Sequence, residues 1–196
     1  MTKSRSARAA GVIACALAVA GIGAAAADAA KTVQVRGGIV FEPNQALTDT
    51  LRFAPGALTV RPNERITWVD RDRMPDPHTI TIVLPREVPD RVNELFNCQS
   101  GPCALANQHL ADPNDPNSDI ARARVNVGKA GLNTRGDSLY LAPGGRISAR
   151  VTARAGRRLA YICAIHPWMQ GSIRVARQSR TAGAAAGGAG LTGRPH

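Results

Sequence analysis

The chain has 196 residues and a net charge of +11 at pH 7, carried mainly by arginine. Aromatic residues make up only 4%, whereas glycine and proline number 19 and 13, a composition that favours short strands joined by turns over a helical bundle. No basic cluster is interleaved with aromatic side chains, so the charge does not indicate a nucleic-acid partner. An acidic protein or a membrane surface is compatible with it.

The first 29 residues predict a secretory signal peptide. Lys3, Arg5 and Arg8 precede an apolar stretch, and residues 27–29 (ADA) resemble a small-residue cleavage site. An uncleaved anchor is the alternative, disfavoured because alanine and glycine insert weakly into membranes. We therefore expect an exported chain, in the periplasm, the cell envelope or the extracellular space, with no stable membrane insertion after cleavage.

Cleavage of the signal peptide would remove Cys15 and leave three cysteines in the exported chain. Cys98 and Cys103 flank a Ser-Gly-Pro turn in "CQSGPC", and an oxidising compartment favours their pairing in a disulfide. If they stayed reduced, they could form a second metal site with His109. Cys163 is left without a partner, and metal ligation is one explanation for an unpaired cysteine in an exported protein.

Alternating apolar residues and turn signals predict a single domain over residues 30–176, built as a β-sandwich or barrel. The predicted strands lie in residues 32–41, 57–70, 78–84, 138–163 and 171–176.

The segment 78–84, "HTITIVL", is predicted to be a strand because its residues alternate with a period of two. This alternation predicts that His78 points the same way as the core residues Ile80 and Ile82, and that Thr79 and Thr81 take the opposite face. An inward imidazole on an apolar face is either a hydrogen-bonded core residue or a ligand.

Residues 85–136 interrupt the strand pattern and are predicted to be an insertion of loops and short helices, held by the disulfide. Within it, residues 112–119 partly fit a calcium loop but lack the glycine and the distal glutamate of that motif. Residues 177–196 are low in complexity and are expected to be a disordered tail.

The stretch 161–171, "YICAIHPWMQG", holds Cys163, His166 and Met169 with the spacing C-x2-H-x2-M. Together with the inward His78, these side chains supply two imidazoles, one thiolate and one thioether. That ligand set is typical of an electron-transfer copper site, in which a single ion alternates between Cu(I) and Cu(II). Structural zinc normally takes four strong ligands, and covalent c-type haem needs C-x-x-C-H.

These segments resemble the type 1 (blue) copper proteins, or cupredoxins, in the branch of plastocyanin, pseudoazurin and amicyanin. The resemblance covers "FAPGALTVRPNERITWVDRDRMPDPHTITIV" and "LYLAPGGRISARVTARAGRRLAYICAIHPWMQGSIRV". It implies an all-β Greek-key sandwich with copper near one end, interrupted here by the insertion. It implies four ligands, which are His78, Cys163, His166 and Met169.

The resemblance also implies residues around the metal. The hydroxyl of Thr79 is expected to hydrogen-bond near the copper loop. Electrons are expected to leave through the edge of the loop histidine, so the exit patch would comprise Ile165, His166, Pro167 and Trp168. The insertion at 85–136 departs from the small members of the family, and it is expected to cover or extend this end of the molecule.

We expect a monomeric one-electron carrier that docks briefly with an acidic redox donor and acceptor, and not an enzyme. The four histidines of the whole chain are too few for the further copper centres of a multicopper oxidase or a nitrite reductase. A copper protein for storage or delivery in the cell envelope is the alternative. The chain has only three methionines, whereas such proteins often use methionine-rich sites.

Overall fold

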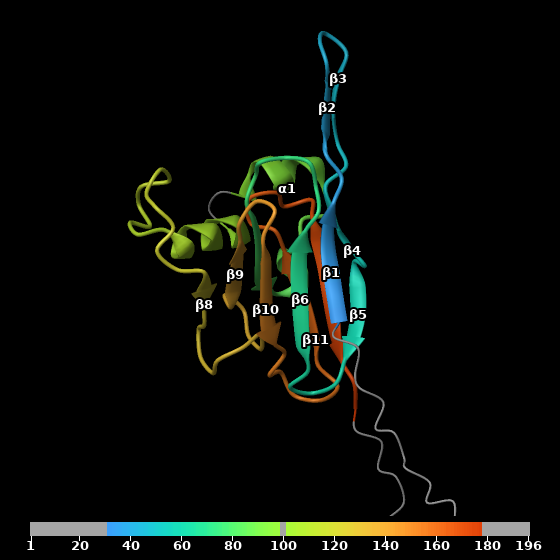
Figure 1. Ribbon diagram of the computed structural model, residues 1–196, viewed down its shortest axis with the longest axis vertical. Helices are drawn as coiled ribbons and strands as arrows, with labels where there is room; N and C mark the ends of the chain where they lie inside the picture. Colours follow the sequence, from blue (N-terminus) through green and yellow to red (C-terminus); the bar gives the residue numbers. More distant parts are fainter. Residues whose placement is uncertain (1–30, 99–100, 178–196) are drawn as a thin grey trace, which may run out of the picture.

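The computed structural model describes residues 31–98 and 101–177, which form two main β-sheets and a two-stranded ribbon (Figure 1). The four-stranded sheet has the order β10 (Arg146–Arg150), β6 (Arg65–Asp70), β1 (Lys31–Arg36) and β4 (Arg52–Ala54). The six-stranded sheet has the order β5 (Ala57–Val60), β12 (Gln170–Val175), β11 (Arg158–Ile162), β7 (His78–Val83), β9 (Ser138–Leu141) and β8 (Arg124–Val125). The predicted signal peptide and, apart from Arg177, the predicted tail lie outside the described residues.

The strand connections confirm the predicted all-β Greek-key sandwich. β1 pairs in parallel with β6, and β5 pairs in parallel with β12, whereas the other neighbours are antiparallel. The chain crosses between the sheets at the turn after β5, where Asn63 adopts a positive φ of 65°. Asparagine tolerates this left-handed conformation better than most residues.

The core lies between the two main sheets and is built from the inward side chains of their strands. Its largest fully buried members include Ile66, Trp68, Ile80, Tyr161 and Ile173. The ring of Tyr161 lies over Gly171, its neighbour across the β11–β12 pair, and a Cβ atom at Gly171 would collide with that ring. Glycine is therefore required where the two strands that flank the 163–169 loop come together.

The expected alternation of β7 is present, with Ile80 and Ile82 in the sandwich core and Thr79 and Thr81 side by side on the other face, but both faces are covered. All six of its residues are buried, so Thr79 and Thr81 do not face solvent. The reason is the insertion, which comprises η1 (Pro85–Glu87), α1 (Val92–Phe96), η3 (Pro102–His109) and β8. Because η3 packs against β7, β8 and β9, it covers the face of the sheet that points away from the sandwich core.

The predicted strand at 32–41 is divided by its two glycines. After β1 the chain leaves the sandwich as the ribbon of β2 (Ile39–Glu42) and β3 (Ala46–Asp49), which projects beyond the sheets at the same end as α1 (Figure 1). Val40, Phe41 and Leu47 are exposed on it. Among the described residues, no helix has the length and hydrophobicity needed to span a bilayer.

Candidate metal centre

Three parts of the fold bring the predicted site residues to one end of the sandwich. His78 is the first residue of β7, Cys163 directly follows β11, and His166 and Met169 lie in the loop that joins β11 to β12. His78, Cys163 and Met169 are 0% exposed, and His166 is 8% exposed. The strand ends on both sides of the loop thus hold the four side chains at fixed positions.

Three donor atoms of this group form a nearly regular triangle. Sγ of Cys163 lies 3.8 Å from Nδ1 of His78 and 3.7 Å from Nδ1 of His166, and the two nitrogens are 3.3 Å apart. The centre of this triangle lies about 2 Å from each atom, close to the length of a metal–nitrogen bond. The geometry therefore has room for one ion bound by all three atoms.

The loop keeps its own shape through backbone hydrogen bonds. The N–H of Met169 donates to the carbonyl of His166 at 2.8 Å, and the N–H of Cys163 donates to the carbonyl of Met169 at 2.9 Å. These bonds close the loop into a tight turn, which explains why a spacing of three residues brings the sulfur of Cys163 and the ring of His166 to the same point.

The orientation of His78 is set by a buried carboxylate. Nε2 of His78 donates to Oδ2 of Asp72 at 2.6 Å, and both side chains are 0% exposed. Asp72 is itself held by the N–H of Met74, which donates to its other oxygen. With the proton on Nε2, the Nδ1 lone pair faces Cys163 and His166, as a metal ligand requires.

Asp70, Asp72 and His78 also form a compact group of possible metal ligands. The oxygens of Asp70, however, accept the backbone N–H groups of Asp72 and Gly144. Asp70 therefore fixes the loop that carries Asp72, and this group belongs to the support of the His78 ring.

The sulfur of Cys163 lies in an environment that favours the thiolate. Burial alone would raise the pKa of this thiol, but contacts with the two imidazole rings and the N–H of Thr79 lower it to about 6. The Thr79 N–H lies 3.3 Å from Sγ, and the hydroxyl of Thr79 accepts the N–H of Ala164 at 2.7 Å. Thr79 thus connects β7 to both the sulfur and the backbone of the loop.

The pKa of His78 moves in the opposite direction to that of Cys163. Burial alone would lower it, yet the sulfur on one side of the ring and the Asp72 carboxylate on the other raise it above its usual value. Without a metal, the site therefore favours a thiolate beside a protonated imidazole. A cation at the centre of the triangle would take over the role of that proton.

No protein-family model matches the chain, and no curated protein matches it by sequence. Solved structures do match it. One is a purple cupredoxin from Nitrosopumilus maritimus, 18% identical, covering 74% of this chain and 99% of that chain with a TM-score of 0.37. The auracyanin of Roseiflexus castenholzii is 15% identical over 76% of this chain and 98% of that chain, TM-score 0.38. The amicyanin of Paracoccus versutus is 14% identical, and the match covers 76% of this chain and 82% of that chain with a TM-score of 0.34.

The chain resembles blue copper proteins. Because the identities and TM-scores to these cupredoxins are low, the assignment of a metal rests on the residues of this chain. Two imidazole nitrogens and a thiolate in a triangle fit the trigonal ligand set of a cupredoxin copper site. The side chain of Met169, which carries a thioether, is fully buried in the same loop.

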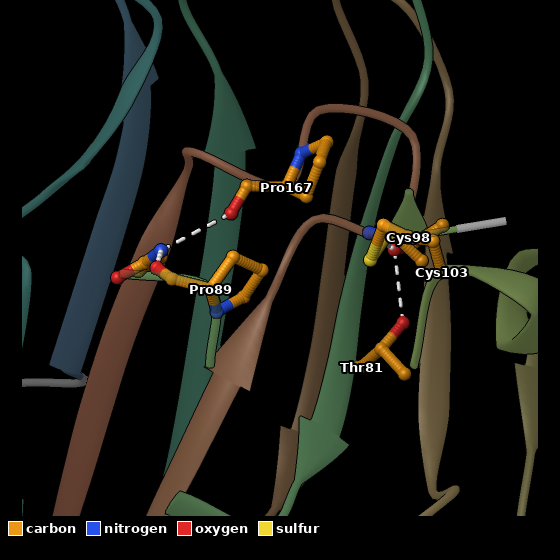
Figure 2. Close-up of a disulfide and its surroundings, with 8 residues drawn as sticks. Thr81, Pro89, Cys98, Cys103 and Pro167 are labelled. Carbon is orange, nitrogen blue, oxygen red and sulfur yellow. Dashed lines mark hydrogen bonds between the residues drawn. A yellow bond between two sulfur atoms is a disulfide. The ribbon is translucent and has the colours of Figure 1, made fainter. Parts of the chain in front are cut away.

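The expected exit patch is smaller than the sequence predicted. Ile165 and Trp168 are 40% and 39% exposed, but Pro167 is buried and does not contribute to the surface. Pro167 lies close to Pro89 of the insertion, and the amide of Gln170 donates to the carbonyls of both prolines, at 3.3 Å and 2.6 Å (Figure 2). Through Pro89, the insertion is therefore joined to the end of the molecule that carries the 163–169 loop.

The alternative metal sites in the insertion are not formed in the described residues. Cys98 and Cys103 are joined in the expected disulfide, close to Thr81 (Figure 2), so they are not available beside His109. In the turn-rich run, Asp112 and Asp115 accept backbone N–H groups two residues further on. These carboxylates therefore stabilise turns.

Sequence reasoning missed Asp72. Three aspartates precede His78, one at the last position of β6 and two in the loop after it, at positions 70, 72 and 76. Their spacing to His78 carries no periodic signal, because the segment is an irregular loop. A search for a carboxylate near each predicted histidine ligand would have listed all three without selecting one.

Proposed function

We infer that the chain is a mononuclear type 1 copper protein that carries single electrons between redox partners. The observation that carries this proposal is the buried triangle of His78 Nδ1, His166 Nδ1 and Cys163 Sγ. These three residues, together with the thioether of Met169, would hold copper, which would supply a one-electron Cu(I)/Cu(II) couple.

The chain's own residues prepare the site for that role. Asp72 holds the proton of His78 on the nitrogen that faces away from the centre. The Thr79 N–H donates to the sulfur and so favours its thiolate form. The closed loop fixes His166 relative to Cys163. Since these contacts hold the donor atoms rigidly, little rearrangement would accompany a change of oxidation state.

Burial of the donor atoms favours an electron carrier over an enzyme. The four side chains are between 0% and 8% exposed, which leaves no open ligand position that a substrate would reach from solvent. The same burial argues against copper delivery, because a delivery site must surrender its ion to a partner. A chelator challenge separates the two functions, since a carrier retains its copper and a delivery protein loses it.

The proposed route for electrons passes through His166. Its ring contacts Trp168 edge-on, with ring centroids 5.3 Å apart, and Trp168 and Ile165 are exposed beside it. An apolar contact at this point would bring the redox centre of a partner near the imidazole edge and would allow rapid dissociation.

A basic groove near the metal centre supports an acidic partner. The groove has a volume of about 610 Å³ and is lined by Gln34, Arg36, Gly37, Arg52, Arg71 and Arg73. No acidic residue lines it, and Arg71 and Arg73 flank Asp72, which holds His78. A negatively charged surface would be attracted to the side of the protein that carries the site.

Export is part of the proposal. The signal-like N-terminal sequence and the Cys98–Cys103 disulfide support it, because disulfides persist in oxidising compartments. The experiment that tests the function is the visible spectrum and voltammetry of the copper-loaded chain. An intense blue band and a reversible one-electron wave are expected, whereas a colourless Cu(II) form would contradict the proposal.

A further inference from the structure

The insertion contains a buried histidine that the metal centre does not use. His109 ends η3 and is 1% exposed. Nδ1 of its ring lies 2.7 Å from the carbonyl oxygen of Arg122, and Nε2 lies 2.8 Å from the hydroxyl of Ser138 on β9. Both nitrogens of this ring therefore have a hydrogen-bond partner.

From Ser138, buried hydroxyls form a continuous line to the metal loop. Oγ of Ser138 lies 2.8 Å from Oγ1 of Thr81, which lies 2.9 Å from Oγ1 of Thr79. Thr79 in turn accepts the N–H of Ala164 at 2.7 Å. Because Thr79 follows His78 and Ala164 follows Cys163, the line connects His109 to the backbone beside two of the proposed ligands.

The two ends of this line determine the direction of every hydrogen bond in it. At one end the carbonyl of Arg122 only accepts, so Nδ1 of His109 carries a proton; in the neutral ring, Nε2 is then an acceptor. Nε2 therefore accepts a hydrogen bond from the hydroxyl of Ser138, and the oxygen of Ser138 accepts one from the hydroxyl of Thr81.

The other end is consistent with the same direction. The oxygen of Thr81 accepts from Thr79, and the oxygen of Thr79 accepts from the N–H of Ala164, which only donates. Each group in the line thus donates its hydrogen bond toward His109. Hydrogen bonds that run in one direction polarise and strengthen one another.

The surroundings of His109 favour the neutral ring that this direction needs. Burial lowers the pKa of His109, the Arg122 carbonyl opposes this, and the Arg122 charge adds to the lowering. The strands packed against η3 are β7, β8 and β9, whose ionisable side chains are His78, Arg124 and Tyr140. None of these strands carries a carboxylate that would stabilise an imidazolium.

We propose that His109 is a positioning residue for the metal loop, acting as the terminal acceptor of a one-directional hydrogen-bond chain through Ser138, Thr81 and Thr79 to Ala164. This inference rests on the proposed function, because the loop is the one that holds Cys163. It gives the insertion a role: the chain fixes the Thr79 hydroxyl as an acceptor for the loop and so keeps the Thr79 N–H directed at the sulfur.

Two substitutions of His109 separate this role from simple packing. His109→Gln keeps an amide oxygen near the position of Nε2, so it can still accept from Ser138. His109→Phe fills a similar volume but has no acceptor. We expect hydrogen exchange at the Ala164 amide of the metal-free chain to rise roughly tenfold in the Phe variant, the effect of weakening one hydrogen bond. It stays near the wild-type rate in the Gln variant, and the core amide of Ile147 is unchanged in both.

The copper-loaded protein gives an independent readout. Hydrogen bonding at the cysteine sulfur tunes the potential of such sites, and a weaker Thr79 N–H bond disfavours the electron-rich reduced state. The midpoint potential should therefore fall in His109→Phe and in Ser138→Ala. In the variant that combines the two changes, it should fall by about as much as in either single variant. His109→Gln should have a potential close to that of the wild-type protein. An additive double variant, or a Gln variant that behaves as Phe does, would overturn the proposal.

Nitrogen-15 NMR of the metal-free chain tests the direction of the chain directly. A neutral ring protonated at Nδ1 is expected for His109, and a proton on Nε2 at neutral pH would refute the assignment. The exchange and NMR measurements need no copper. If the chain failed to bind copper, the proposed function would be wrong while these two arms still decided whether the hydrogen-bond chain exists.

Discussion

Nε2 of His78 lies 2.6 Å from Oδ2 of Asp72, so a residue of the loop after β6 sets which nitrogen of His78 faces the metal centre. Both side chains are excluded from solvent, which strengthens the interaction and makes its loss costly. This pair connects the loop that follows β6 of the four-stranded sheet to the first residue of β7 in the six-stranded sheet.

Replacing Asp72 with asparagine is expected to weaken copper binding by about 10- to 100-fold, the usual effect of altering a partner of a metal-bound histidine. The asparagine amide can still accept a hydrogen bond, but it lacks the negative charge that makes the imidazole a stronger donor to the metal. A competition titration against a chelator of known affinity measures the change.

Asp76→Asn is the matched control for that experiment, because Asp76 lies on the same loop and has no assigned role at His78. We expect it to bind copper as the wild-type chain does. Equal losses of affinity in the two variants would show that the loop, and not the Asp72–His78 pair, is responsible.

The metal loop was predictable because Cys163, His166 and Met169 lie within seven residues, with one predicted strand before them and another after them. His78 was found from the alternation of apolar residues in β7. In the structure, Ile80 and Ile82 lie in the core as that alternation predicts, and His78 is fully buried. The burial of the opposite face could not be predicted, because Thr79 and Thr81 are covered by η3, and the packing of an irregular insertion leaves no period in the sequence. Pro167 was expected at the surface but is buried, on the side where Gln170 joins it to Pro89, 78 positions earlier in the chain.

The metal-free chain should hold Cys163 as a thiolate at neutral pH. Its pKa is lowered to about 6, whereas a free thiol has a pKa of about 8.5. Because the folded state holds its thiol proton less tightly than the unfolded state, the thiolate contributes stability above the pKa of a free thiol. That contribution is lost as the pH falls through the folded value.

Ultraviolet absorption of the thiolate measures this titration, with Cys163→Ser as the blank. The difference between the two proteins should appear with a midpoint near pH 6. A midpoint close to that of a free thiol would mean that the two imidazoles and the Thr79 N–H do not act on the sulfur as the distances indicate.

Met169→Gln tests the proposed axial ligand. The amide oxygen remains a donor, so the blue colour should persist, but oxygen favours Cu(II) over Cu(I) relative to a thioether. We expect the midpoint potential to fall by at least about 59 mV, which corresponds to a tenfold change in preference for a one-electron couple.

Met74→Gln is the control for that substitution, because the hydrogen bond of Met74 to Asp72 comes from its backbone N–H, which the substitution keeps. Voltammetry should give it the wild-type potential. An unchanged potential in Met169→Gln would remove the thioether from the ligand set.

The basic groove should guide anionic partners toward the site. Replacing Arg71 and Arg73 with glutamate is expected to slow reduction by an anionic reagent such as hexacyanoferrate(II) by about tenfold or more at low salt. High salt should abolish the difference, because exposed charges are screened. Stopped-flow kinetics at two ionic strengths measures both effects.

Arg158 and Arg174 provide a matched pair of controls. They are cross-strand neighbours at the opposite end of β11 and β12 from the metal loop. Their replacement by glutamate changes the net charge equally but leaves the groove intact. If both double variants slowed the reaction to the same extent, net charge alone would explain the rates, and the groove would have no particular role.

The visible absorption spectrum of the copper-loaded chain, recorded beside that of Cys163→Ser, decides whether Cys163 binds copper. We expect an intense blue band in the wild-type protein, produced by the bond between copper and the Cys163 thiolate, and its disappearance in a Cys163→Ser variant that remains folded. An unchanged blue spectrum in Cys163→Ser would show that the buried triangle of His78, Cys163 and His166 is not the copper site.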